Sequence, residues 1–391
     1  MKNKKITVLG GAGHIGLPLS IVFANKGFDV SILDNNLKTL SLARKGIMPF
    51  KEQNGAKNLK KALKRKLKFY SKPSDFIFDS TVIITVGTPV DEFLNPDMSQ
   101  IKDCIDSLIP YLKKGQLIIL RSTVYPGTSE WLFKYLKKKK NCDIAFCHER
   151  VIQGFTFDEI EKLPQIIAAS SNKAAKRATN IFKNISKKIV YCSLKEAEFS
   201  KLFSNAYRYS QFAISNEFYM LADKAGLDFN KIRKITKEGY PRAESMPSAG
   251  FAAGPCLLKD TMQLLSFSRN NFSLGNSSML VNEGLVLYLV DKLESKYNLK
   301  SKNVGLLGMA FKAECDDTRS SLSYKMKKFL LPRVNKLFCT DPYVKTDKEL
   351  SSLNQTIKES DILILCVPHK KYKKLNMKNK DFIDIWGYIK K

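Results

Sequence analysis

A cysteine in a loop of small residues is the best candidate for covalent chemistry. Cys256 closes the stretch that runs from Gly250 through Gly254, and Lys259 and Asp260 follow it. We expect a helix to begin at this cysteine, and a helix amino terminus with a nearby lysine lowers the pKa of a thiol and favours the nucleophilic thiolate. Asp260, four residues on, shares the helix face of Cys256 and could act as a base. The alternative for a lone cysteine is a small hydrophobic residue of the core.

Lys201 and Asn205 form a second candidate group, because they are four residues apart in a long predicted helix. Residues at this spacing share one helix face. An ammonium and an amide that point into a cleft could stabilise an oxyanion that develops during a reaction. The alternative is a solvated lysine beside a capping asparagine, and the sequence alone favours that alternative.

A glycine motif near the start of the chain predicts a dinucleotide site. The motif is Gly11-Ala12-Gly13-His14-Ile15-Gly16. It follows an apolar strand, Ile6 to Leu9, and opens a helix, which is the context in which such glycines bind a pyrophosphate. Asp34 stands 18 residues after Gly16, where its carboxylate would bind the adenosine ribose and repel a 2′-phosphate. We therefore expect NAD rather than NADP; the alternative is a structural turn with an exposed aspartate.

Two later strands end in loops that are candidates for the same site. Gly87-Thr88-Pro89 follows the strand Ser80 to Val86, and Thr123 follows the strand Leu117 to Leu120. Cofactors in open parallel sheets bind beyond the carboxyl ends of the strands. Both loops are therefore expected to contact NAD, with an ordinary turn as the alternative.

The order of strand and helix patterns predicts the fold class α/β. Strands alternate with helices up to about residue 193, which predicts a parallel sheet with both faces covered. The next segment is mainly helical and begins with one long helix, Leu194 to Ala225, and alternation resumes after residue 300. We expect two Rossmann-like, doubly wound parallel-sheet domains, residues 1–193 and 301–391, joined by a helical central domain, residues 194–300.

The composition is that of a folded and strongly basic protein. Of 391 residues, 44% are hydrophobic and 26% are charged, and 66 Lys and Arg against 37 Asp and Glu give a net charge of +29. This excess suggests anionic partners, but no Arg/aromatic stripe accompanies it, so no specific nucleic-acid site is expected.

The cysteine and hydropathy patterns predict the compartment. The eight cysteines are dispersed without a C-x-x-C pair, which predicts no metal site and a reduced, cytoplasmic location. No apolar run reaches the ~18 residues of a membrane span, so no membrane partner is expected. The basic start, Met1 to Lys5, with the apolar stretch after it is similar to a signal peptide, but the glycine motif favours a nucleotide-binding strand and helix.

Motifs along nearly the whole chain resemble the UDP-glucose/GDP-mannose dehydrogenase family of nucleotide-sugar 6-dehydrogenases. They are, in order, the glycine motif, Gly87-Thr88-Pro89, residues 121–128 (RSTVYPGT), Glu149-Arg150-Val151 with Gly154, Lys201 with Asn205, Asn216-Glu217, the Cys256 loop with Lys259-Asp260, residues 308–312 (GMAFK), and Asp316-Asp317 with Arg319-Ser320.

The resemblance implies an NAD-dependent, four-electron oxidation of the C6 alcohol of a UDP-sugar to a carboxylate. Cys256 would attack the intermediate aldehyde to form a thiohemiacetal and then a thioester, which water hydrolyses. Lys201 and Asn205 would stabilise the oxyanion. The residues that would position the water or assist proton transfer are Asp260, Thr123 and Glu149.

The resemblance also implies how substrate and a second copy are held. The residues expected at the UDP-sugar are Glu149, Arg150, Val151, Lys201, Asn205, Arg242, Gly250, Phe251, Lys312 and Arg319. Lys312 and Arg319 would belong to a C-terminal domain that closes the substrate site. The long middle helix would form a homodimer.

Departures from the family pattern affect the prediction of which sugar the chain would oxidise. Glucose-type members usually carry P-E-F-L-x-E-G where residues 148–154 read HERVIQG, so Gln153 replaces the second acid. Glu149-Arg150-Val151 is more similar to the branch that acts on UDP-N-acetylmannosamine or a related UDP-N-acetylhexosamine. That branch often has a histidine where Pro255 stands. The alternatives are a UDP-glucose 6-dehydrogenase that forms UDP-glucuronate, a non-catalytic NAD-binding scaffold, and a nucleic-acid binder driven by net charge.

Overall fold

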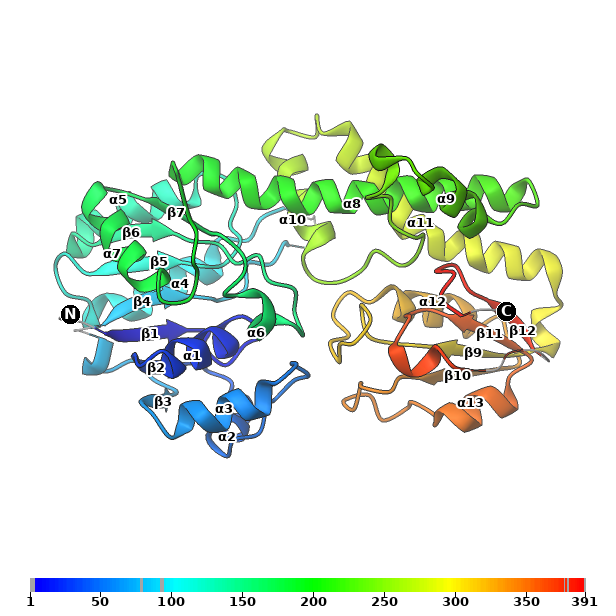
Figure 1. The fold of residues 1–391 in the computed structure, drawn as a ribbon, viewed down its shortest axis with the longest axis horizontal. Coiled ribbons are helices and arrows are strands. Elements are labelled where there is room, and N and C mark those ends of the chain that lie inside the picture. Colours follow the sequence, from blue (N-terminus) through cyan, green and yellow to red (C-terminus); the bar gives the residue numbers. More distant parts are fainter. Residues whose placement is uncertain (1–3, 78–79, 92–94, 376, 378–379, 390–391) are drawn as a thin grey trace. The chain divides into compact units, whose positions relative to one another are not determined.

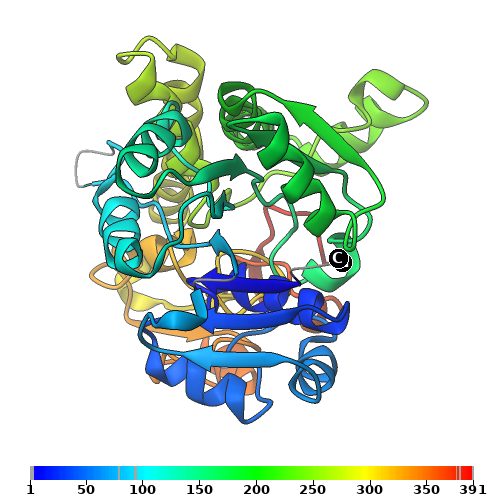
Figure 2. The same ribbon diagram turned by 90° about the vertical axis from the view of Figure 1, so that its left-hand side faces the viewer.

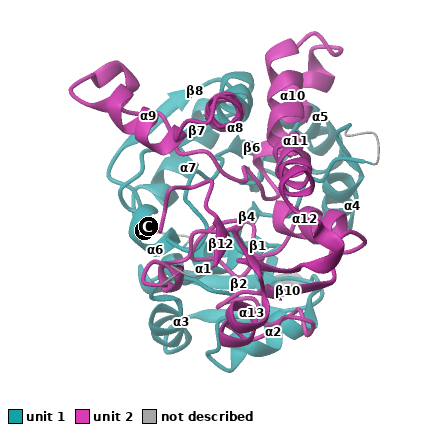
Figure 3. Cartoon of the chain, turned by 90° about the vertical axis from the view of Figure 1, so that its right-hand side faces the viewer, with its two compact units in different colours: residues 1–203 teal, residues 204–391 magenta. Residues whose placement is uncertain are grey.

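The computed structural model describes residues 4–77, 80–91, 95–375, 377 and 380–389. Two compact units make up the chain, residues 1–203 and 204–391. Figure 3 colours the two units separately.

An eight-stranded sheet forms the core of the first unit. Its strands follow the order β3-β2-β1-β4-β5-β6-β7-β8. They are β1 (Lys5–Leu9), β2 (Asp29–Leu33), β3 (Leu67–Tyr70), β4 (Thr81–Ile84), β5 (Leu117–Leu120), β6 (Asp143–Phe146), β7 (Gln165–Ala169) and β8 (Ile189–Cys192). All neighbouring strands run parallel except β6 and β7, which pair antiparallel. The reversal of strand order beside β1 is that of a doubly wound fold, in which ligands bind at the carboxyl ends of the strands.

Alternate residues of the central strands enter two separate cores. Ile83 and Ile119 pack with α1, α2, α3 and α7, whereas their neighbours Val82 and Ile118 pack with α4 and α5. Helices therefore cover both faces of the sheet (Figure 2). The helices of this unit are α1 (Gly16–Asn25), α2 (Leu37–Arg44), α3 (Gly55–Leu63), α4 (Ser99–Leu108), α5 (Thr128–Lys140), α6 (Thr156–Glu159) and α7 (Asn172–Phe182).

Helix α8 (Leu194–Lys224) is 31 residues long and runs through the boundary between the units (Figure 1). Its sequence contains neither glycine nor proline, the residues least compatible with a helix interior. The helix ends just before Gly226, which adopts a φ of +71°. Glycine reaches this left-handed conformation at little cost and commonly ends helices.

The second unit contains a sheet of four parallel strands in the order β10-β9-β11-β12. The strands are β9 (Asn303–Leu307), β10 (Lys336–Thr340), β11 (Ile362–Leu365) and β12 (Asp381–Ile383). The other helices of this unit are α9 (Phe229–Lys237), α10 (Leu257–Phe267), α11 (Ser273–Lys296), α12 (Leu322–Leu330) and α13 (Leu353–Glu359). Val304 and Leu306 of β9 share a core with α11 and α12. None of the described helices combines the length and hydropathy needed to cross a membrane.

The predicted fold class is confirmed. The structure contains a Rossmann-like sheet domain, a second parallel sheet and a long helix between them in the chain, which begins at Leu194 as predicted. One detail differs, because the strands β7 and β8 run antiparallel to the rest of the first sheet. The domain boundaries at residues 193 and 300 stay predictions.

Candidate active site

The loop between β1 and α1 has the shape that a dinucleotide requires. A Cβ atom at Gly16 would lie 2.4 Å from the carbonyl oxygen of Gly10, and one at Gly11 would lie 2.6 Å from a backbone oxygen of β1. Both positions therefore accept only glycine. A Cβ atom at Gly13 would meet no atom closer than the Gly10 oxygen at 3.4 Å, so a ligand group can approach the backbone there. The residues present fit a bound pyrophosphate.

Asp34 lies beside this glycine motif. Its carboxylate accepts hydrogen bonds of 2.9 Å from the backbone N–H groups of Ala12 and Asn36. These two bonds fix the acid at the end of β2. Its position fits the predicted role at the ribose of NAD.

The first glycine loop is also bonded to a more distant loop. Gln153 Nε2 lies 3.0 Å from His14 Nδ1, and Ile15 precedes the first residue of α1. The buried carboxylate of Glu52 accepts hydrogen bonds from backbone N–H groups of the same distant loop, those of Gly154 at 2.9 Å and Thr156 at 2.6 Å. Gln153 is thus held against the glycine motif.

The loops after β4 and β5 are bonded to each other. The Thr88 hydroxyl donates to the carbonyl oxygen of Thr123 at 2.5 Å. A second bond, also 2.5 Å long, joins the Ser122 hydroxyl to a carbonyl oxygen of the first loop. Gly87 is exposed and Pro89 is half-buried, so this edge of the sheet is open to a ligand.

A buried arginine organises the predicted substrate loop of the first unit. Arg121, only 2% exposed, pairs with the Glu149 carboxylate and donates to two further oxygens at 2.8 Å each. Glu149 also accepts hydrogen bonds from the backbone N–H groups of Arg150 at 2.8 Å and Val151 at 3.2 Å. The Arg150 side chain turns to the carbonyl oxygen of Pro164. Glu149 is therefore held in one orientation.

His148, directly before Glu149, is 2% exposed, and neither ring nitrogen has a hydrogen-bond partner among the described residues. Burial lowers the pKa of His148 to about 2, and the positive charges of Lys201, Arg121 and Arg150 act in the same direction. The imidazole is therefore neutral at physiological pH. Lys201 lies within electrostatic range of this loop.

Cys256 is exposed and directly precedes the first residue of α10. Its thiol is therefore accessible, as a nucleophile must be. The preceding loop packs tightly, because a Cβ atom at Gly254 or Gly250 would lie 2.4 Å from the ring of Phe311 or Trp386, respectively. Both glycines also have positive φ, +103° and +153°. The cysteine is thus carried on a loop that rests directly on two aromatic rings.

A buried asparagine of α8 fixes the same loop. Asn216 Oδ1 accepts a hydrogen bond of 2.8 Å from the backbone N–H of Gly250, and its Nδ2 donates to the Gly250 carbonyl oxygen at 3.1 Å. The same Nδ2 donates to Asn282 of α11 at 2.8 Å. Phe251, the next residue of the loop, is buried. The loop geometry is therefore set by residues far from it in the sequence.

The predicted amide and carboxylate partners of the cysteine are in contact. Asn205 Nδ2 donates to Asp260 Oδ2 at 2.5 Å, and Lys259 Nζ lies 2.6 Å from Asp260 Oδ1. The Asp260 side chain is fully buried. A carboxylate held by these two partners orients the Asn205 amide. Lys201, half-buried, precedes Asn205 by one turn on the same face of α8.

Arg319 is the predicted substrate residue with a direct electrostatic link to the thiol. Its guanidinium forms an ion pair of 2.5 Å with Asp317. The hydrogen bond to Asp317 raises the pKa of Arg319 against the effect of burial, and the negative charge of ionised Cys256 adds to this rise. Arg319 therefore places a positive charge within electrostatic range of Cys256. Lys312 is half-buried and follows Phe311 in the same loop.

One predicted substrate residue, Arg242, lies at the surface of the second unit. Arg242 is exposed, and its guanidinium lies over the ring of Tyr240, 5.3 Å from the centroid. No hydrogen bond or ion pair described for it reaches the Cys256 loop. Its assignment to the substrate stays a prediction.

Three supporting residues were not identified as such from the sequence. They are Arg121 as the partner of Glu149, Asn282 as the partner of Asn216, and Trp386 beneath Gly250. An arginine that directly follows the apolar strand 117–120 is a signal of a buried charge. The other two carry no local signal, because their partners are distant in the chain.

Comparisons with known proteins identify the same family in all three parts of the chain. The sequence matches the UDP-glucose/GDP-mannose dehydrogenase family in its NAD binding domain over residues 4–186, its central domain over residues 195–283 and its UDP binding domain over residues 305–391. The UDP-N-acetyl-D-mannosamine dehydrogenase of Pyrococcus horikoshii is 30% identical over 407 residues, which cover 99% of this chain and 96% of that protein. The enzyme of that name from Methanocaldococcus jannaschii is 29% identical over 393 residues, 99% of this chain and 90% of that protein.

Solved structures show the same relationship. The structure of the UDP-D-ManNAc dehydrogenase of Pyrococcus horikoshii superposes with a TM-score of 0.89 at 28% identity and covers 99% of this chain and 96% of that chain. The UDP-N-acetyl-mannosamine dehydrogenase of Staphylococcus aureus has a TM-score of 0.88 at 24% identity, with 99% and 95% covered, and shares the fold. The motifs, the glycine loop, the accessible thiol and these matches lead to one conclusion: this chain is an oxidoreductase of the UDP-glucose/GDP-mannose dehydrogenase family.

Proposed function

We propose that the chain oxidises the C6 alcohol of a UDP-sugar to a carboxylate with two molecules of NAD. The preferred substrate is UDP-N-acetylmannosamine or a related UDP-N-acetylhexosamine, because the relatives named above carry that substrate in their names and Glu149-Arg150-Val151 is similar to their motif. The observation that carries the proposal is the exposed thiol of Cys256 at the start of α10, with the Arg319 charge and the Asn205–Asp260 pair on the same unit.

The reaction balances with one water. An alcohol, two NAD⁺ and water give a carboxylate, two NADH and three protons. Bound NAD supplies the hydride acceptor for each of the two oxidations. Gly13 and Asp34 would hold its pyrophosphate and ribose, and the Gly87-Thr88-Pro89 and Thr123 loops would border it.

Cys256 would form the covalent intermediates. Its thiolate adds to the C6 aldehyde, which forms a C–S bond and places negative charge on the aldehyde oxygen. The second N–H of the Asn205 amide is available for that oxygen, because one N–H already donates to Asp260. The Lys201 ammonium would provide the other stabilising charge. Oxidation of the thiohemiacetal gives a thioester.

Hydrolysis would return the thiol. Water attacks the thioester carbonyl, the C–S bond breaks, and Cys256 leaves as a thiolate. Glu149 and Thr123 would orient the water or receive its proton, and the fixed orientation of Glu149 beside Arg121 supports such a role. Asp260 would act at least by holding Asn205. Lys312 and Arg319 would bind the diphosphate as cations.

A substrate panel tests the proposal. The purified full chain is incubated with NAD and with UDP-N-acetylmannosamine, UDP-N-acetylglucosamine, UDP-glucose or GDP-mannose, while NADH is followed by absorbance and products by mass. We expect two NADH for each uronate formed from a UDP-N-acetylhexosamine. Turnover of UDP-glucose alone would favour the alternative enzyme, and NAD binding without any turnover would favour the scaffold.

Two cysteine variants separate the thiol chemistry from general damage. Cys256→Ser is expected to abolish uronate formation, whereas Cys192→Ser, at a half-buried cysteine of β8, is expected to retain it. Uronate formation by Cys256→Ser at the wild-type rate would remove the thiol from the mechanism.

We further propose a homodimer through α8. The helix exposes a stripe of large apolar side chains with helical spacing, namely Tyr207 (64% exposed), Ile214 (47%), Phe218 (45%) and Leu221 (59%). The stripe adjoins an apolar hollow of about 380 Å³ between α8 and α9. Contiguous apolar surface of this kind marks an interface. Light scattering should show a dimer that becomes a monomer in Ile214→Asp, but not in the control Leu331→Asp, which changes an exposed leucine at the end of α12.

A further inference from the structure

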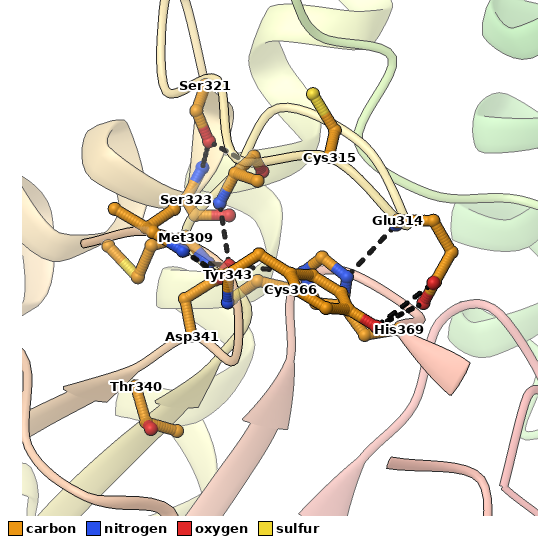
Figure 4. A network of polar contacts seen from close by, with 12 residues as sticks. Met309, Glu314, Cys315, Ser321, Ser323, Thr340, Asp341, Tyr343, Cys366 and His369 are labelled. Carbon is orange, nitrogen blue, oxygen red and sulfur yellow. Dashed lines mark hydrogen bonds and ion pairs between the residues drawn. The ribbon is translucent and has the colours of Figure 1, made fainter. Parts of the chain in front are cut away.

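A buried histidine connects two parts of the second unit. His369, which follows β11, is completely buried and lies between the carboxylate of Asp341 and the backbone of Glu314 (Figure 4). Its Nε2 is 3.1 Å from Asp341 Oδ2, and its Nδ1 is 3.1 Å from the backbone nitrogen of Glu314. Both ring nitrogens are therefore used.

The backbone partner determines the tautomer of this histidine. The backbone N–H of Glu314 can only donate, so Nδ1 of His369 must carry a lone pair and accept. The ring proton is therefore on Nε2, from which it is donated to Asp341. A doubly protonated ring would place an N–H against the N–H of Glu314, and the bond to the loop would be lost. The two hydrogen bonds therefore select the tautomer that carries its proton on Nε2.

Asp341 extends this arrangement to the start of the same loop. Its side chain is fully buried, and its Oδ2 accepts hydrogen bonds from the backbone N–H groups of Met309 at 2.7 Å and Ala310 at 3.0 Å. Its Oδ1 accepts from the backbone N–H groups of Tyr343 and Val344 at 2.8 and 3.1 Å. The Asp341 carboxylate therefore binds the start of the loop directly, and it is connected to Glu314 through the ring of His369.

Glu314 is the centre of the loop and adopts an unusual conformation. Its φ is +56°, a left-handed value that is costly for a residue with a side chain. Its carboxylate accepts hydrogen bonds from the Tyr343 hydroxyl at 3.0 Å and from the backbone N–H of Lys370 at 2.9 Å. The contacts to His369, Tyr343 and Lys370 together hold the conformation that the chain alone disfavours.

The loop so held, residues 308–320, touches the cysteine loop directly. The ring of Phe311 fills the space where Gly254 has no side chain. The carbonyl oxygen of Ser320 accepts a hydrogen bond of 3.2 Å from the backbone N–H of Gly254, two residues before Cys256. Lys312 and Arg319 lie between these two contacts in the sequence. A shift of the loop would therefore move both cations and the support of the thiol.

We propose that His369 is a positioning residue that, through Asp341 and Glu314, holds residues 308–320 where Lys312 and Arg319 meet the diphosphate of the nucleotide sugar. The inference rests on the proposed function. It assigns His369 no contact with substrate. We expect His369 to affect the binding of the nucleotide sugar and not the binding of NAD. Every residue predicted to bind NAD lies in the first unit, within residues 11–123.

Paired substitutions test each of the two bonds. His369→Gln can still donate to Asp341, and His369→Asn can still accept from Glu314, but neither keeps both bonds. We expect each to raise the KM for the nucleotide sugar and the Kd for UDP, measured by calorimetry, by at least tenfold. The KM for NAD should stay within twofold. Tyr324→Phe, which removes a hydroxyl bonded to Asp347 in the same unit, is the control and should change none of these values.

Tyr343→Phe keeps the test decisive should the His369 variants fail to fold. It removes one bond to the Glu314 carboxylate and leaves the His369–Asp341 pair intact. We expect a smaller rise in the same two constants. Unchanged constants in all folded variants, or equal changes for NAD and sugar, would overturn the positioning role while the enzyme stays active. A wild-type chain that neither binds UDP nor reduces NAD would instead overturn the proposed function and this inference with it.

Discussion

The side-chain amide of Asn205 on α8 donates a hydrogen bond of 2.5 Å to the buried carboxylate of Asp260 on α10. The two residues are 55 positions apart in the chain, and the bond connects the long helix to the helix that directly follows Cys256. Because an amide has two N–H groups, this bond leaves one of them for a reacting oxygen. A contact that stabilises the unit thereby also orients a predicted catalytic group.

Replacement of Asp260 by asparagine should destabilise the fold and slow the reaction. The change removes the charge that Lys259 pairs with, at a site where the aspartate is fully buried. Loss of one partner of a buried pair costs about 3 kcal/mol or more. Urea unfolding of Asp260→Asn should show this loss. Asp381→Asn is the control, because its pair with Lys296 is more than half exposed and should cost under about 1 kcal/mol. Equal losses in the two variants would contradict the structural argument.

Two glycines of the first loop should respond differently to alanine. Gly16→Ala places a methyl group 2.4 Å from a backbone oxygen, so the loop must distort and the fold should be weakened. Gly13→Ala meets its nearest atom at an ordinary 3.4 Å, so stability should change little. The new methyl group would, however, occupy the space assigned to the pyrophosphate. We expect a rise of at least tenfold in the KM for NAD with an unchanged melting temperature, and an unchanged KM would remove the loop from the cofactor site.

The elements that carry strong periodic patterns were predictable, and the weakly patterned ones were not. The long helix begins at Leu194 as predicted, because 31 residues without a helix breaker leave few alternatives. Strands β3 and β8 were not predicted. Both lie at sheet edges and are only partly buried; β3 contains a lysine, and β8 is a run of only four apolar residues that is half exposed. The antiparallel direction of β7 has no local signal, because strand direction depends on where the connection crosses the sheet.

In the candidate site, too, some residues could be predicted from the sequence and others could not. Cys256, Asp260 and Asn205 could be selected from spacing and from the family resemblance, and the structure places the last two in contact. The residues that hold the site in place could not be predicted from the sequence, because each of their hydrogen bonds joins positions that are far apart in the chain. Asn216 reaches Gly250 across 34 residues, and His369 reaches Asp341 across 28. Tertiary packing alone brings such pairs together.

Substitution of Asp34 should change the preference between the two nicotinamide cofactors. Its carboxylate lies at the glycine motif through two backbone hydrogen bonds, where it would repel a 2′-phosphate. Asp34→Ser removes this repulsion and the ribose contact. A hydrogen bond to a charged group contributes about 1.5–3 kcal/mol, so the kcat/KM for NAD should fall roughly tenfold or more. The ratio of kcat/KM values for NAD and NADP should move toward one, and an unchanged ratio would place the ribose elsewhere.

His148 should make the fold sensitive to acid. Burial lowers the pKa of this imidazole to about 2, whereas an unfolded histidine titrates near 6.5. Between these values the unfolded chain binds a proton that the folded chain excludes, so stability falls as the pH drops below about 6.5, by about 1.4 kcal/mol per pH unit. His148→Leu removes this proton and no hydrogen bond to a described residue.

The variant should therefore lose less stability than the wild type on acidification, by about 2 kcal/mol between pH 6.5 and pH 5. Urea unfolding at several pH values measures the difference, and the value at pH 7.5, where histidine is neutral in both states, corrects for packing. Parallel pH profiles of the two proteins would show that His148 gains a proton in the folded state. The environment of the buried ring argues against that outcome, since a further positive charge there would meet those of Lys201, Arg121 and Arg150, and neither ring nitrogen has a hydrogen-bond partner among the described residues.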